Sequence, residues 1–165
     1  MAHIDRSKKL RPSIFDRLLD DAPHNKLESE PDRYQNLKTL RQSVRRDLEQ
    51  LLNTRYRIVS PPPEHGQLEH SLLNYGLPDL ATINIIDANQ KKEFIRHMEK
   101  VIRTYEPRFK SVKVTHHDNK DKTDRALRFR IDAVLYADPS PEIVVFDSVL
   151  ESVTRSVSVT ELGHG

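Results

Sequence analysis

Glu106, Pro107 and Arg108 place opposite charges on either side of a proline. Proline fixes its own φ and disfavours helical geometry in the preceding residue, so both charged side chains are held in a narrow range of orientations. A guanidinium held in this way can offer a planar fork to a carboxylate or to main-chain carbonyls at a small entropic cost. The residues alone leave two interpretations open: a proline stop with two solvated charges, or a pre-shaped docking handle for another protein.

The sequence contains no set of residues whose spacing suits a metal site. The chain contains no cysteine, and its eight histidines include the neighbours His116 and His117 and the pair His65 and His70. Adjacent strand residues point to opposite faces of a sheet, and a five-residue separation fits no helical face. Neither pair has the geometry of a zinc site, and the four glycines form no phosphate-binding loop. We expect neither a metal nor a cofactor.

Catalysis would need an activated nucleophile or a pair of carboxylates. No serine lies in the Gly-x-Ser-x-Gly turn that exposes a nucleophile. Glycoside hydrolysis requires two carboxylates across a sugar cleft. Glu93 and Glu99 point to different faces of a predicted helix, and Glu106 follows that helix. Because nothing distinguishes these acids from the other carboxylates, we interpret them as a solvated helix surface and predict that the protein is not an enzyme.

An arginine-rich run from residue 41 to residue 57 is a candidate for binding an anionic partner. Arg41 and Arg45 lie one helical turn apart and could present a basic ridge. Asp47 and Glu49 interrupt this ridge, and 27 basic against 25 acidic residues leave a net charge of only +2. The pattern favours local ion pairs on a solvated helix face, such as Arg45 to Glu49, over nucleic-acid binding.

Size and composition indicate one domain with a modest core. The chain has 165 residues, of which 36% are hydrophobic and 32% charged. Apolar stretches such as IVVF at residues 143–146 are far too short to cross a bilayer. No apolar run follows the basic N-terminus to form a signal-peptide core. We therefore expect a soluble, cytoplasmic protein with no direct membrane insertion.

The residue pattern also predicts the elements that position these side chains. Residues 1–33 are predicted to form an N-terminal extension with a short amphipathic helix at Ile14 to Leu19, and residues 34–162 the domain. Helical periodicity predicts helices at 36–54, 68–73 and 87–105, and alternation predicts strands at 111–117, 126–137, 142–150 and 152–160. Helices before strands indicate an α+β fold, with helices packed on one face of a small, mostly antiparallel β-sheet.

Three segments together carry a family resemblance. They are SVRRDLEQLLNTR (Ser43 to Arg55), SLLNYGLPDL (Ser71 to Leu80) and YEPR (Tyr105 to Arg108). In this order and spacing they resemble the baseplate wedge family shared by contractile phage tails and bacterial type VI secretion systems. The resemblance spans about Pro12 to Leu162, and the segment SIFDRLLDD at residues 13–21 is most similar to the type VI branch.

The resemblance implies a structural subunit in a cytoplasmic baseplate that is docked to an inner-membrane complex. Its implied partners are the wedge subunits TssF and TssG, the linker TssK, and the sheath proteins TssB and TssC. The family's Glu-Pro-Arg loop is associated with the helical bundle at the wedge core, which assigns Glu106, Pro107 and Arg108 as docking residues. We predict Tyr105, Arg41 and Arg45 as further partner-binding residues.

The resemblance also raises two further expectations. The family has carried the label "lysozyme-like", so a peptidoglycan-cleaving muramidase is the alternative function, and a nucleic-acid-associated adaptor is a third. Sheath subunits of this kind join by exchanging strands, and an unpaired strand edge can template such an exchange. We expect that edge within residues 142–160.

Overall fold

The computed structural model describes residues 18, 23–24, 37–56, 64, 66–79, 87–119, 126–137, 140–151 and 154–162. Apart from Leu18, the helix predicted at Ile14 to Leu19 lies outside the described residues. The same holds for residues 152–153 at the start of the last predicted strand. The division into an extension at 1–33 and a domain at 34–162 stays a prediction.

Two long helices form where the sequence repeats an apolar stripe at helical spacing: α2 (Leu37–Asn53) and α3 (Ala88–Tyr105). Both predicted helices are confirmed to within one residue at each end. Asp87 caps the start of α3, because its carboxylate accepts a hydrogen bond of 2.8 Å from the backbone N–H of Asn89.

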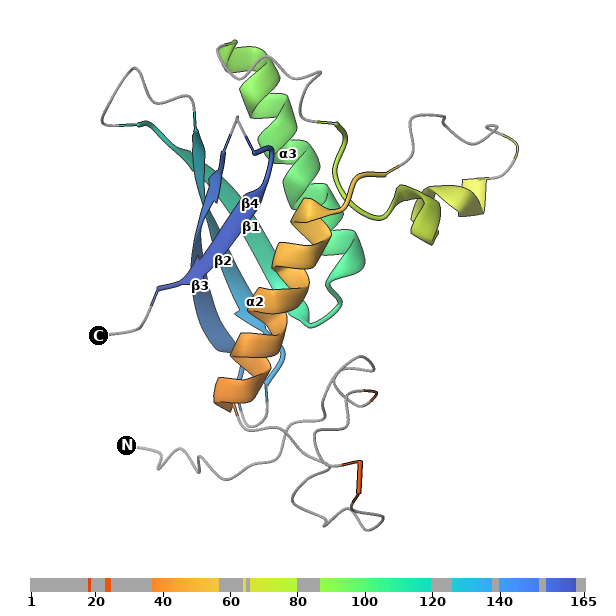
Figure 1. Ribbon diagram of the computed structural model, residues 1–165, viewed down its shortest axis with the longest axis vertical. Helices are drawn as coiled ribbons and strands as arrows, with labels where there is room; N and C mark the ends of the chain where they lie inside the picture. Colours follow the sequence, from red (N-terminus) through yellow and green to blue (C-terminus); the bar gives the residue numbers. More distant parts are fainter. Residues whose placement is uncertain are drawn as a thin grey trace.

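The predicted helix at 68–73 is instead a pair of short 3-10 helices, η2 (Gly66–His70) and η3 (Leu72–Asn74). Ser71 separates them. Its hydroxyl donates to the carbonyl of Leu68 at 2.8 Å and accepts from the backbone N–H of Leu73 at 3.3 Å. A serine that bonds to nearby backbone in this way competes with continuous helix. This pair projects sideways from the rest of the fold (Figure 1).

The strands form one antiparallel sheet in the order β1-β2-β3-β4, so each strand pairs with its sequence neighbours. Their bounds are β1 Phe109–His117, β2 Leu127–Leu135, β3 Glu142–Leu150 and β4 Val157–Glu161. Along β2 and β3, every second side chain is buried, as the alternation predicts. The edges of the sheet are therefore β1 and β4.

Two strand boundaries differ from the prediction. β1 begins at Phe109, two residues earlier than expected, because an irregular register extends its pairing towards α3. β4 begins at Val157, five residues later than expected. Just before β4, the backbone N–H of Glu151 donates to the carbonyl of Ser156 at 3.0 Å, and Arg155 has a positive φ of 54°.

Both helices pack on one face of the sheet, α2 over β4 and α3 over β1 (Figure 1). The core lies between the two layers, and its largest fully buried aromatic side chains are Phe129 and Phe146. The predicted α+β class, with helices on one face of an antiparallel sheet, is confirmed. The remaining apolar core comes mainly from the stripes of α2 and α3 and from the inner positions of the strands.

Ser148 is the exception on the inner face of β3. This residue is 2% exposed, and its hydroxyl has no hydrogen-bond partner among the described residues. We expect Ser148→Ala to raise the free energy of unfolding by about 1 kcal/mol, because an unpaired hydroxyl loses its hydration on burial. Urea denaturation measures the change. A loss of stability instead would mean that the hydroxyl has a partner in solution.

Candidate partner-docking site

The Glu-Pro-Arg tripeptide connects α3 to β1. Glu106 ends the helix: its backbone is non-helical (φ −113°, ψ 83°), and its N–H still donates to the carbonyl of Ile102 at 2.9 Å. Pro107 lies exposed in the turn, and Phe109 then starts β1. The tripeptide therefore sits at a corner where a helix turns into an edge strand.

Glu106 and Arg108 form an ion pair inside this corner. The Arg108 Nε donates to Glu106 Oε1 at 2.6 Å, and Nη2 donates to Oε2 at 2.5 Å. Glu106 is only 5% exposed, and the Arg108 side chain is 19% exposed. The interpretation of two solvated charges is therefore wrong. Two parallel bonds of this kind give a planar, geometrically specific pair.

The remaining donors of Arg108 reach across to α2. Its Nη1 donates to the Ser43 hydroxyl at 2.9 Å, and its Nη2 donates to Asp47 Oδ2 at 2.6 Å. Ser43 and Asp47 lie one turn apart on the same face of α2. We call the four residues Ser43, Asp47, Glu106 and Arg108 the corner network. Sequence reasoning missed Ser43 and Asp47 as members; the available signal was their helical spacing within the first family motif.

The corner network changes the proton affinity of nearby groups. Burial alone would lower the pKa of the Arg108 guanidinium, but hydrogen bonds and charge from Glu106 and Asp47 outweigh it and raise that pKa. Burial raises the pKa of the Tyr75 hydroxyl, and the negative charges of Asp47 and Glu106 raise it further. Arg108 therefore stays charged, and Tyr75 stays neutral at neutral pH.

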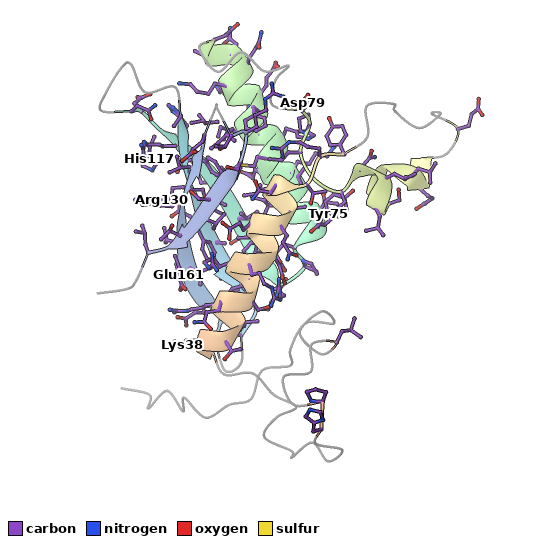
Figure 2. The ribbon with its side chains drawn as sticks, in the orientation of Figure 1. Lys38, Tyr75, Asp79, His117, Arg130 and Glu161 are labelled. Carbon is purple, nitrogen blue, oxygen red and sulfur yellow. The ribbon has the colours of Figure 1, made fainter. Side chains whose placement is uncertain are left out.

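Tyr105 connects the tripeptide to the second family motif. Its ring meets Tyr75 edge to face at 5.3 Å between centroids, and its hydroxyl donates to the carbonyl of Ser71 at 3.0 Å. Leu77 in turn pairs with the end of the first motif, because its N–H donates to the carbonyl of Thr54 at 2.8 Å. All three motifs thus meet beside one corner of the fold, where Tyr75 lies next to α2 and α3 (Figure 2).

Arg41 and Arg45 lie on the opposite side of α2 from Ser43 and Asp47, towards the sheet. Arg41 pairs with Glu142 and, at 3.4 Å, with Glu161, which lies at the end of β4 beside α2 (Figure 2). The predicted pair of Arg45 and Glu49 is confirmed at 3.0 Å. The structure does not bring these two arginines together with the tripeptide, and their part in partner binding stays a prediction.

Two of the three carboxylates considered for catalysis have structural contacts, and the third, Glu93, lies exposed on α3. Glu99 accepts hydrogen bonds from Arg103 Nη2 at 2.7 Å and from the backbone N–H of Val114 at 3.1 Å, so its assignment to a solvated surface is wrong. Glu106 belongs to the corner network. Within the described ranges, no group of three or more His, Asp or Glu side chains could hold a metal ion. Among those same residues, no helix is long and apolar enough to span a membrane.

The fold and the site define a small α+β structural protein in which charged side chains join the layers to one another. Residues 38–140 match the family described as "Baseplate wedge protein gp25", and the chain belongs to this family. It is therefore a baseplate wedge component of contractile tail-like machinery, from a structural family, and it binds other baseplate subunits. No match was found among curated proteins or among solved structures.

Proposed function

We propose that this chain is TssE, the wedge-family subunit of a bacterial type VI secretion baseplate. In this proposal it joins TssF and TssG in the cytoplasm, with TssK linking the baseplate to the inner-membrane complex. It then helps to initiate assembly of the contractile sheath of TssB and TssC. The family match at 38–140 supports the wedge role, and the segment at 13–21 supports the type VI branch.

We further propose that the exposed corner around Pro107 is the docking surface for the wedge. The observation that carries this proposal is the position of an exposed proline directly above a buried ion pair. The corner network holds the backbone on both sides of Pro107, so a partner that grips this turn orders little that is not already fixed. In this proposal Arg108 supports the docking surface by holding the corner rigid and does not itself grip the partner. Its guanidinium already donates to Ser43, Asp47 and Glu106.

We propose no catalytic activity for this subunit. The muramidase alternative would need a carboxylate that is free to act as an acid or nucleophile. Of the three acids considered for that role, Glu99 and Glu106 hold parts of the fold together, and Glu93 lies exposed on α3. The wedge family is itself structural.

Replacing the exposed proline tests the docking surface with the corner network left in place. We expect Pro107→Gln to reduce co-purification of TssF and TssG by about tenfold, the effect of losing one well-placed interface contact. Co-purification from cells that contain the complete secretion system measures the recovery, and thermal unfolding checks that the variant is folded.

The matched control is Lys92→Gln, which places the same side chain at an exposed site near the other end of α3. This control should recover both wedge subunits at the wild-type level. If folded Pro107→Gln does the same, the corner is not the docking surface.

A further inference from the structure

The outer edge of β4 is covered by side chains from α2. In an antiparallel pair, the backbone groups of successive residues point alternately towards the neighbouring strand and away from it. Leu162 N–H donates to the carbonyl of Val145 on β3 at 2.9 Å, so even-numbered positions face β3 and Val157 and Val159 face outwards. The outward groups are the ones that would pair with a further strand.

Asn53 occupies both outward groups of Val157. Its Nδ2 donates to the Val157 carbonyl at 2.8 Å, and its Oδ1 accepts from the Val157 N–H at 2.8 Å. A carboxamide has the same donor and acceptor as a peptide group, so this contact reproduces the two-bond exchange of an antiparallel residue pair. Arg45 covers the next outward carbonyl, that of Val159, through Nη1 at 3.2 Å.

The opposite edge of the sheet is covered in the same way by α3. Glu99 accepts from the backbone N–H of Val114 at 3.1 Å, and Arg103 Nη2 donates to the carbonyl of Val112 at 3.3 Å. Glu99 and Arg103 also pair with each other at 2.7 Å. Two helices that differ in sequence thus direct polar side chains to the outward backbone groups of the two edge strands.

We propose that these contacts are edge guards, with Asn53 and Arg45 as the guards of β4, and that they prevent a second copy of the chain from pairing with the sheet. An uncovered edge strand is a template for any extended segment, and another copy of the same strand is the segment at highest local abundance during synthesis. Each guard is a side chain, so it can move aside without a change in the fold. The inference goes beyond the proposed function and does not depend on it.

The strand edge expected within residues 142–160 is the outer edge of β4, and the guards cover part of it. β3 is paired on both sides, and on β4 both outward groups of Val157 and the carbonyl of Val159 are already bonded. Any strand that joins β4 must therefore displace Asn53, exchanging one pair of hydrogen bonds for another of the same kind. The free energy of this exchange is close to zero for the first residue. The exchange favours the incoming strand only where further residues pair.

Removing one guard tests the proposal on the purified full-length chain. We expect Asn53→Leu to shift the protein from monomer to a concentration-dependent dimer in sedimentation velocity, while the wild type stays monomeric. The matched control is Asn89→Leu, which adds the same apolar side chain at an exposed site in the first turn of α3. It should remain monomeric, because it uncovers no backbone group of the sheet.

A second substitution locates the new contact. Glu161 is the next outward position on β4, and proline there removes a donor that edge pairing requires. Adding Glu161→Pro to Asn53→Leu should restore the monomer. The proposal is overturned if folded Asn53→Leu stays monomeric, if its dimer survives Glu161→Pro, or if Asn89→Leu dimerises equally.

If Asn53→Leu does not fold, Arg45→Met tests the proposal in its place. It uncovers the Val159 carbonyl and keeps the apolar part of the side chain, with Arg96→Met as the exposed control on α3. If Arg45→Met forms a dimer and Arg96→Met does not, the proposal of edge guards is supported. If both variants are monomers, the proposal is overturned. Recovery of wedge subunits plays no part in these measurements, so failure here and failure of the proposed function are distinguishable.

Discussion

Arg108→Met is expected to lower the free energy of unfolding by about 3–5 kcal/mol, the effect of removing one partner from a buried ion pair. The Glu106 side chain is 6% exposed and accepts two hydrogen bonds from the Arg108 guanidinium. Methionine fills similar space but donates nothing, so Glu106 would keep a buried charge with no counter-charge inside the corner network. Urea denaturation followed by circular dichroism measures the loss.

Two comparisons separate this effect from the general effect of losing an arginine. Arg96→Met removes the guanidinium of an exposed residue on α3, and it should change stability by less than about 0.5 kcal/mol. Adding Glu106→Gln to Arg108→Met removes the stranded charge and should recover about 1–3 kcal/mol. Equal stability of Arg108→Met and the wild type would show that the corner network contributes nothing.

The corner network also determines how docking experiments on the tripeptide must be designed. A variant of Arg108 that fails to join the wedge could fail because the corner is distorted, since the same guanidinium holds Ser43 and Asp47 of α2. Loss of assembly in such a variant is therefore ambiguous. Pro107 is exposed and belongs to no side-chain network, so a change there reports on the surface itself.

Much of the fold could be predicted from local pattern. The apolar stripe at residues 36–54 predicted α2, because period and amphipathicity are properties of a few consecutive residues. The alternation along 127–135 likewise identified β2 and its buried face. Ser71 shows where this method fails: its hydroxyl bonds to nearby backbone and divides a predicted helix in two.

The contacts of the site could not be predicted, because they join residues far apart in the sequence. Arg108 meets Asp47 across 61 positions, and Asn53 meets Val157 across 104. Nothing in either local sequence indicates its partner, and Glu99 was assigned to solvent for the same reason. The family motifs did indicate where the site lies, since the three segments that carry the resemblance meet at one corner.

Gly76→Ala is expected to destabilise the protein by about 3–4 kcal/mol, from backbone strain and from lost hydrogen bonds. Gly76 has a φ of +106°, a conformation that L side chains rarely adopt. A Cβ at this position would also lie 2.3 Å from the carbonyl oxygen of Thr54, where the obstacle is backbone and cannot rotate away. Thr54 and Leu77 would have to separate, and with them the bond of 2.8 Å between their backbone groups.

Gly76→Ala is also expected to disturb the docking corner, because residue 76 lies in the segment against which Tyr105 packs. Leu77 is fully buried, so displacing it opens the core beside α2, and Tyr75 would move away from the ring of Tyr105. We expect Gly76→Ala to lower the urea midpoint and to reduce the near-ultraviolet dichroism of the tyrosines. Gly66→Ala is the matched control: a Cβ there meets nothing within 4 Å, and stability should change by less than about 0.5 kcal/mol. Equal stability of the two variants would show that the close approach of Gly76 to Thr54 does not hold the second motif against the first.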